Sequence, residues 1–204
     1  TTTALRLAHN VNVPIWPMSD APVRTIVATA AGPLEFQDYF VRQQAQPVAQ
    51  GFHYSGCESA PPSGGAMNAL EAAELAAIIL SPSNPWLSIA PILSIGDIKA
   101  TITTNAAPVI AVSPIVNGSA IKGPTAKLMR ELGLEPSVDN IARHYRGIVD
   151  GLIIDAQDHA RKDAIEAMGI RVYITNTVMQ SLADKAELAQ HVLDFAAQLR
   201  AEQA

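Results

Sequence analysis

The segments PVIAVS at residues 108–113 and GLIID at residues 151–155 decide the fold, because each is a continuous apolar run that ends in a polar residue. Two more largely apolar runs are AAIIL at residues 76–80 and IRVYIT at residues 170–175. Runs of this length are typical of parallel strands that are buried on both faces. The sequence therefore predicts one sheet in which the strands at 76–80, 108–113 and 151–155 lie adjacent or nearly adjacent.

Helical patterns lie between these strands and after the last one. They are expected at residues 95–104, 125–132, 138–145, 159–168 and 184–200. The alternation of strands and helices predicts an α/β protein with three α/β/α layers and a Rossmann-like, mostly parallel sheet, folded as one domain over residues 1–204. The first half is less regular. Strands are expected there at 23–30 and 48–55, with a short helix at 35–42 between them and a loop at 59–65.

The composition describes a well-buried globular protein and argues against several classes of function. The 204 residues are 49% hydrophobic and 16% charged, with a net charge of -5. Because Lys and Arg form no cluster, we expect no nucleic-acid partner. No apolar run approaches the ~20 residues of a membrane span, and the N-terminus lacks the pattern of a signal peptide. The lone Cys57 excludes an internal disulfide framework and favours a reducing, cytoplasmic compartment.

The loop after the strand at 76–80 is the first candidate binding segment. In open α/β sheets, ligands bind beyond the carboxyl ends of the strands. Hydroxyls, an amide and stiffening prolines gather in this loop as Ser81, Pro82, Ser83, Asn84, Pro85 and Ser88. Short hydroxyls and free backbone N–H groups at a helix start can form an anion cradle. The same residues can equally serve as a loop that caps a helix, and the sequence leaves both interpretations open.

The segment after the strand at 108–113 repeats this arrangement. It contains Ser113 at the strand end, followed by Lys122 and Gly123, and Pro124 suits the first position of the next helix. A lysine beside a helix N-terminus is unfavourable unless an anion is present, which favours a phosphate or carboxylate ligand. The alternative is an ordinary solvated lysine. We expect both loops to face one cleft, because both follow strands of the same sheet.

Charged residues elsewhere give two weaker candidates. Asp155 ends the strand at 151–155 and Asp158 follows three residues later, so the pair can hold Mg²⁺ or cap the helix that follows. Asp20 and Arg24 lie close together in the first half and can read a polar ring or a phosphate. They can also form a surface ion pair of little energetic worth.

Taken together, these segments resemble the 2-phospho-L-lactate transferase family. The similarity is carried by SPSNPWLSIAPIL at 81–93, PVIAVSPIVNGSAIKGPTAKLM at 108–129, LGLEPS at 132–137, LIIDAQD at 152–158 and, upstream, PMSDAPVRTIVATAAGPLEFQDYFV at 17–41. It covers nearly the whole chain in the order of the family. Its specific parts are the SPSNP stretch and the SPIVNG and KGP stretches.

The resemblance implies a Mg²⁺-dependent transferase of coenzyme F-420 biosynthesis. Members move a 2-phospholactyl group, or in actinobacterial relatives a phosphoenolpyruvyl group, from a guanylylated donor to 7,8-didemethyl-8-hydroxy-5-deazariboflavin and release GMP. The sequence does not discriminate between the two donors. The resemblance also implies a homodimer. The family has an N-terminal part with a Gly-rich loop and acidic metal ligands that has no counterpart here, so we expect little or no transfer activity from this chain alone.

Two other interpretations compete with the transferase. One is a nucleotide-binding regulatory protein of a related α/β fold, and the other is a generic sugar-nucleotide-binding module, which the fold alone does not exclude. The related regulators have a glycine-rich loop at the place where this chain has SPSNP. The SPSNP stretch therefore favours the transferase.

Overall fold

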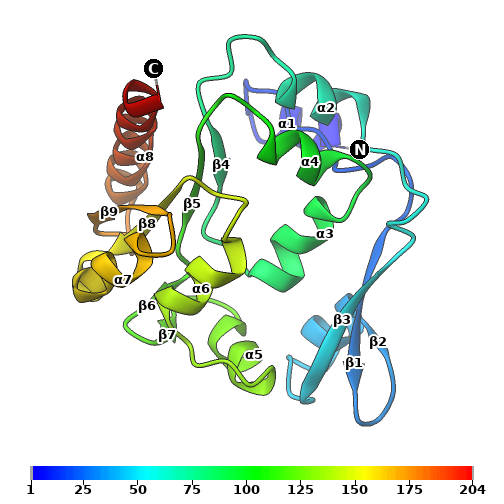
Figure 1. The fold of residues 1–204 in the computed structure, drawn as a ribbon. Coiled ribbons are helices and arrows are strands. Elements are labelled where there is room, and N and C mark those ends of the chain that lie inside the picture. The colour runs from blue at the N-terminus through cyan, green and yellow to red at the C-terminus, as the bar shows by residue number, and fades with distance from the viewer. Residues whose placement is uncertain (1, 204) are drawn as a thin grey trace.

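The computed structural model describes residues 2–203 and contains the predicted central sheet (Figure 1). Its strands are β4 (Ile78–Leu80), β5 (Val109–Val112), β8 (Gly151–Asp155) and β9 (Arg171–Thr175). They lie in the order β4-β5-β8-β9, and every neighbouring pair is parallel. The prediction of a mostly parallel sheet with three consecutive neighbouring strands is thus confirmed.

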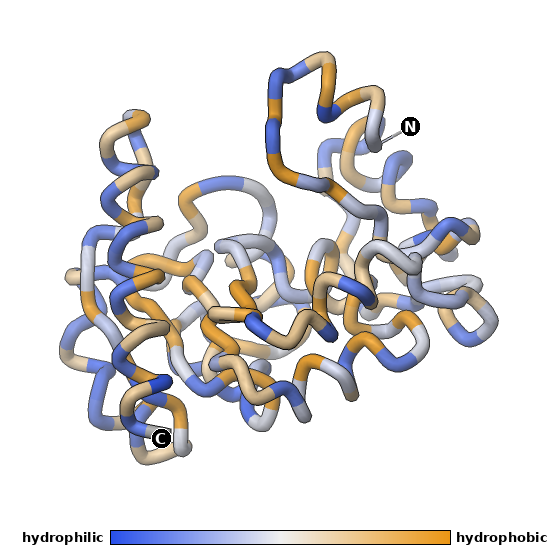
Figure 2. Tube along the Cα trace, turned by 90° about the horizontal axis from the view of Figure 1, so that it is seen from above, coloured by the Kyte–Doolittle hydropathy of each residue, from blue (hydrophilic) through white to orange (hydrophobic). Residues whose placement is uncertain are grey.

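The two faces of this sheet are covered by different helices. On one face, alternate strand residues such as Ile110, Val112 and Ile153 pack against α8 (Leu182–Gln203). The side of α8 that meets the sheet carries Leu188, Val192, Phe195 and Leu199. Figure 2 shows hydrophobic and hydrophilic residues interspersed along the trace that ends at the C-terminus. Successive residues of a strand point to opposite faces of the sheet, so a strand that is covered on both faces buries residues on each side in turn.

The opposite face of the sheet carries the larger core. Its helices are α3 (Ala90–Leu93), α4 (Ile98–Thr103), α5 (Thr125–Glu131), α6 (Val138–Tyr145) and α7 (Lys162–Glu166). The strand residues on this side include Val109, Ala111 and Leu152, and they join buried residues of these helices in one cluster. The sheet therefore lies between two helical layers, and the predicted α/β/α architecture is confirmed (Figure 1).

The first half of the chain forms a separate antiparallel sheet. Its strands are β1 (Arg24–Thr29), β2 (Leu34–Glu35) and β3 (Ala49–Ser55), in the order β2-β1-β3. The two long strands were expected from the sequence, and the expected short helix exists as the π-helical segment η1 (Asp38–Arg42). In Figure 1 this sheet stands beside α3 and α5 rather than extending the parallel sheet.

Several local expectations were wrong. The expected helix at 159–168 is a 3-10 helix, η3 (Ala156–Arg161), that continues into α7. The expected loop at 59–65 already contains the start of α2 (Gly64–Leu70), because the Ser63 hydroxyl accepts a hydrogen bond from the Ala66 N–H at 3.3 Å and caps the helix. The short helices α1 (Thr2–Ala8) and η2 (Pro85–Ile89) were not predicted.

A hairpin after β5 was also missed. It consists of β6 (Ile115–Val116) and β7 (Ser119–Ala120), joined by Asn117 and Gly118. Both linking residues have positive φ, 46° and 72°. An Asn-Gly pair is the usual sequence signal for this kind of two-residue turn, so the signal was present. Across residues 2–203, no helix combines the length and apolarity needed to cross a membrane.

Candidate functional site

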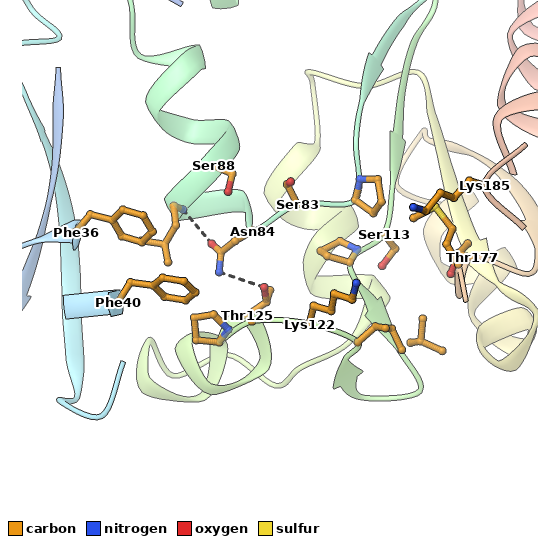
Figure 3. Close-up of a pocket in the computed structure, with 18 residues that line it drawn as sticks. Phe36, Phe40, Ser83, Asn84, Ser88, Ser113, Lys122, Thr125, Thr177 and Lys185 are labelled. Atoms are coloured by element: carbon orange, nitrogen blue, oxygen red, sulfur yellow. Dashed lines mark hydrogen bonds between the residues drawn. The ribbon is translucent and has the colours of Figure 1, made fainter. Parts of the chain in front are cut away.

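The two candidate loops line one cavity of about 480 Å³ at the carboxyl edge of the parallel sheet (Figure 3). The loop after β4 contributes Pro82, Ser83, Asn84 and Ser88. The segment after β5 contributes Ser113, Lys122 and Gly123. The expectation that both loops face one cleft is confirmed, and the physical reason is the parallel register that brings the carboxyl ends of β4 and β5 together.

Four other candidate residues lie outside this cavity. Ser81 is exposed and faces a neighbouring apolar pocket, and Pro85 is buried in the first turn of η2. Asp20 and Arg24 are exposed at the entrance to β1, and neither lines the cavity or takes part in an ion pair among residues 2–203. Their binding role stays a prediction.

Asn84 ties the two loops together. Its side-chain oxygen accepts hydrogen bonds from the backbone N–H groups of Trp86 at 3.0 Å and Leu87 at 2.9 Å, which caps η2. Its amide nitrogen donates to the Thr125 Oγ1 atom at 3.1 Å, across 41 residues of sequence (Figure 3). The capping interpretation is therefore correct for Asn84, and the same side chain also joins η2 to the start of α5.

The start of α5 differs by one residue from the expectation. Pro124 is the N-cap residue, and the helix begins at Thr125 rather than at the proline. Thr125 is buried, with only 2% of its surface exposed, and its hydroxyl accepts the hydrogen bond from Asn84. Lys122 is exposed in the loop just before this helix. Its location beside the helix start is as expected, whereas its anion-binding role is a proposal developed below.

Ser113 shapes the cavity through the backbone. Its hydroxyl donates to the Ile115 carbonyl oxygen at 2.9 Å and accepts from the Ile115 N–H at 3.1 Å, and the residue is buried. These two bonds turn the chain from β5 into the β6–β7 hairpin. We therefore assign Ser113 to the wall of the cavity, with a hydroxyl that is already paired.

The cavity residues that sequence reasoning missed include Phe36, Phe40, Thr177 and Lys185. Thr177 follows β9, so the rule of the carboxyl edge was sufficient to find it. Phe36 directly follows β2, Phe40 belongs to η1, and Lys185 comes from the first turns of α8. No local pattern marks these three residues, because only the packing of distant elements brings them to the site.

The cavity has a cationic character. Lys122 and Lys185 both line it, both are exposed, and neither forms an ion pair with another residue in the described part of the chain. No Asp or Glu is among the lining residues. Two unneutralised ammonium groups at one cavity attract an anion, and phosphate groups are typical ligands of such sites.

Asp155 does not line the cavity, but it binds Thr177, which does. One carboxylate oxygen accepts from the backbone N–H and the hydroxyl of Thr177, at 2.9 and 3.1 Å. The other oxygen accepts from the Gln157 N–H at 3.0 Å and caps η3, so the expected capping role is correct. Burial raises the pKa of Asp155, but these hydrogen bonds outweigh it and hold the pKa below the usual value of 3.8.

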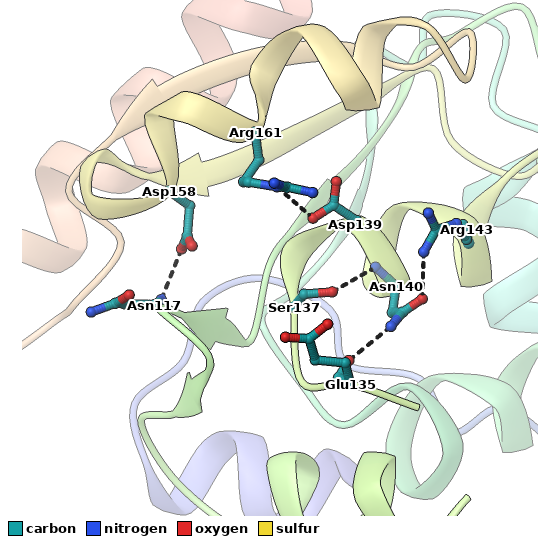
Figure 4. Close-up of polar contacts among 8 residues, drawn as sticks. All are labelled: Asn117, Glu135, Ser137, Asp139, Asn140, Arg143, Asp158 and Arg161. Atoms are coloured by element: carbon teal, nitrogen blue, oxygen red, sulfur yellow. Dashed lines mark hydrogen bonds and ion pairs between the residues drawn. The ribbon is translucent and has the colours of Figure 1, made fainter. Parts of the chain in front are cut away.

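Asp158 serves a different loop. Its carboxylate accepts from the backbone N–H of Asn117 at 3.0 Å and so holds the β6–β7 hairpin against η3 (Figure 4). Burial raises the pKa of Asp158. Nearby, Arg161 donates to the buried carboxylate of Asp139 at 2.8 Å. Asp155 and Asp158 thus bind different protein donors instead of converging on one point.

The side chains of the cavity differ from those that usually bind Mg²⁺. Hard cations of this kind prefer carboxylate and phosphate oxygens. The cavity offers hydroxyls, one amide and two ammonium groups, and no group of three His, Cys, Asp or Glu side chains suited to a metal occurs within residues 2–203. The lining of the cavity therefore supplies no carboxylate for Mg²⁺, and the expected metal stays a prediction.

The fold and the cavity define a Rossmann-like α/β protein with a cavity lined by two lysines at the carboxyl edge of its sheet. Comparison with known proteins specifies the class further. Residues 1–195 match the model of the family described as 2-phospho-L-lactate transferase CofD, and the chain belongs to this family. The resemblance drawn from the sequence segments is thereby confirmed.

Relatives from archaea and actinobacteria agree with this assignment. The 2-phospho-L-lactate transferase of Methanopyrus kandleri is 37% identical over 91% of this chain and 58% of its own length. That of Methanocaldococcus jannaschii is 36% identical over 95% of this chain and 61% of its own length. The phosphoenolpyruvate transferase of Streptomyces griseus is 33% identical over 98% of this chain and 64% of its own length. The chain therefore spans about three fifths of the relatives that it matches.

Proposed function

We propose that this chain supplies the anion-binding and acceptor-binding cavity of a transferase in coenzyme F-420 biosynthesis. The reaction moves a 2-phospholactyl or phosphoenolpyruvyl group from a guanylylated donor to 7,8-didemethyl-8-hydroxy-5-deazariboflavin. Family membership supports the reaction class. The observation that carries the assignment to this cavity is the presence of Lys122 and Lys185 in a pocket without carboxylates.

The chemical step is a displacement at phosphorus. The terminal ribityl hydroxyl of the acceptor attacks the phosphorus that bears the transferred acid, a new P–O bond forms, and the P–O bond to GMP breaks. The hydroxyl proton is released and GMP leaves with the bridging oxygen. Catalysis of such reactions rests mainly on positioning and on neutralising charge on the phosphoryl oxygens.

The residues of this chain would act on position and charge. Lys122 and Lys185 would balance the negative charge of the diphosphate, and the hydroxyls of Ser83 and Ser88 would orient its oxygens. Asn84 would keep η2 and α5 at a fixed spacing through its bond to Thr125. Mg²⁺, when bound with the diphosphate, would supply further charge neutralisation.

The test concerns Lys122→Ala and binding of a guanine nucleotide. A charge-assisted hydrogen bond is worth about 1.5–3 kcal/mol, so GDP should bind about ten- to a hundredfold more weakly. The deazaflavin should lose less affinity because its ring carries little charge. Titration calorimetry of each ligand with the 204-residue chain measures both effects. Lys99→Ala is the matched control, because Lys99 is exposed and does not line the cavity.

The outcomes separate this proposal from its competitor. Unchanged GDP affinity in Lys122→Ala would make Lys122 an ordinary solvated lysine. A nucleotide-binding regulatory protein would bind GDP in a Lys122-dependent way without binding the deazaflavin. Binding of both ligands, with Lys122 needed mainly for GDP, supports the transferase. The homodimer expected from the resemblance is a separate proposal, which sedimentation of the chain tests directly.

A further inference from the structure

One wall of the cavity is an aromatic pair formed by Phe36 and Phe40 (Figure 3). The two ring centroids lie 5.4 Å apart with an angle of 18° between the ring planes, which is a stacked arrangement. Phe40 keeps 40% of its surface exposed. Phe36 is half-buried, so the exposed apolar surface of the pair is the Phe40 ring. An exposed aromatic ring on the wall of a pocket is costly in water, so this surface is suited to a flat apolar partner.

The pair is held in place from behind by buried contacts. Phe36 and Phe40 are four residues apart and thus share one side of a helical turn. Tyr39 is fully buried in a cluster with Leu87 and Leu128, against which Phe36 also packs. The Tyr39 side chain therefore anchors η1 to η2 and α5, and the two phenylalanines face the cavity.

Two hydrogen bonds strengthen this anchor. The Lys127 ammonium group donates to the Pro47 carbonyl oxygen at 3.1 Å. The Glu131 carboxylate accepts from the Ala49 N–H at 3.1 Å. Both join α5, which begins at the cavity, to the segment that leads into β3. The aromatic wall is thus fixed relative to the helix beside Lys122.

From this arrangement we infer that the Phe36–Phe40 pair is the stacking platform for a flat heteroaromatic ring, with the Phe40 ring as its exposed surface. The inference rests on the proposed function, which places a charged phosphate and a planar ring in the same cavity. Stacking needs only a π face and no hydrogen-bond partner. The ligand ring is either the deazaflavin of the acceptor or the guanine of the donor.

The lining of the cavity divides in a way that fits such a two-part ligand. Phe36, Phe40 and Leu87 form an apolar part, whereas Lys122 and Lys185 supply the charge. In Figure 3 the rings of Phe36 and Phe40 point toward Asn84, and the ammonium groups belong to other elements. A ligand that joins a flat ring to a phosphate would therefore occupy both parts at once.

The experiment compares variants at Phe40 in binding of three probes to the 204-residue chain: the deazaflavin, GDP and inorganic pyrophosphate. Phe40→Ala should weaken binding of a ring-bearing probe by about five- to a hundredfold, the range for removing one aromatic stacking partner. Phe40→Leu should also weaken it, because leucine is apolar but has no flat face. Phe40→Tyr should bind within about twofold of the wild type. Pyrophosphate binding should not change, since it has no ring.

Val41→Ala is the matched control, because Val41 is 64% exposed and does not line the cavity. Thermal unfolding of each variant verifies that the fold is retained. A loss confined to the deazaflavin assigns the platform to the acceptor, and a loss confined to GDP assigns it to the donor; either result supports the platform. Equal affinity of Phe40→Ala and the wild type for both rings overturns it, as does an equal loss of pyrophosphate binding. If the wild type binds neither ring, the proposed function itself fails.

Discussion

Asn84 is the residue whose replacement tests the architecture of the site most directly. Its side chain makes three hydrogen bonds, two that cap η2 and one that reaches Thr125 at the start of α5. Loss of a helix N-cap costs about 1 kcal/mol, within a range of 0.5–2 kcal/mol. Loss of a neutral hydrogen bond costs about 0.5–1.5 kcal/mol more. Asn84→Ala should therefore lower the free energy of unfolding by about 1–3 kcal/mol.

Two further variants separate these contributions. Asn84→Asp keeps an oxygen that accepts from the Trp86 and Leu87 N–H groups, and the Thr125 hydroxyl can turn to donate to it, so this variant should lose less than Asn84→Ala. Thr125→Val removes the partner at α5. If the bridge exists, the effects of Asn84→Ala and Thr125→Val will not add, and the double mutant will be less destabilised than the sum.

Urea denaturation followed by circular dichroism gives the free energies of unfolding. A loss below about 0.5 kcal/mol in Asn84→Ala, smaller than the lower bound for a cap, would refute the reasoning. Strict additivity with Thr125→Val would refute the bridge and leave only the cap. GDP affinity, measured on the same variants, shows whether the spacing of η2 and α5 affects the cavity.

The remaining predictions concern Asp155, which binds Thr177 at the cavity, and the packing of α8 on the sheet. Because the pKa of Asp155 is lowered in the folded state, its stabilisation is present above about pH 4 and is lost as the pH falls through the folded pKa. Asp155→Asn should therefore cost about 1–2 kcal/mol at pH 7, and a difference from the wild type that stays constant down to pH 2 in denaturation curves would contradict this. Gly151→Ala should cost about 1–3 kcal/mol by overpacking, since its new Cβ would lie 2.6 Å from the Phe195 ring. Gly51→Ala, with no atom within 4 Å of the new Cβ, is the control. Equal stability of the two glycine variants would contradict the prediction, because it would mean that α8 shifts away from the new methyl group without a cost in stability.

Local sequence was sufficient for the elements of the parallel sheet. The runs around Val109 and Gly151 are apolar up to a polar last residue, and their strands are buried at every position in the fold. Burial on both faces imposes that pattern, so the pattern predicts the strand. The same rule placed Ser83 and Lys122 in one cavity, because carboxyl ends of parallel neighbours must share an edge.

Helix type and helix ends were less accessible to local reasoning. The segment after Asp155 has helical periodicity, but its first turns are a 3-10 helix, which the Asp155 side chain caps by accepting from the Gln157 N–H. Ser63 and Asn84 are caps that the sequence allowed without requiring. Whether such a residue caps a helix or binds a ligand depends on the N–H groups that the fold brings to it.

The sequence alone determined the fold class, the adjacency of three strands and the family, because these follow from the burial patterns of the strands and from recurring segments such as SPSNP. Tertiary structure decided the composition of the cavity. Phe40 and Lys185 reach it from η1 and α8, and Asn84 bonds to Thr125 across 41 residues. No periodicity encodes these contacts, since they arise only when an antiparallel sheet, a parallel sheet and a terminal helix pack together and bury their apolar faces against one another.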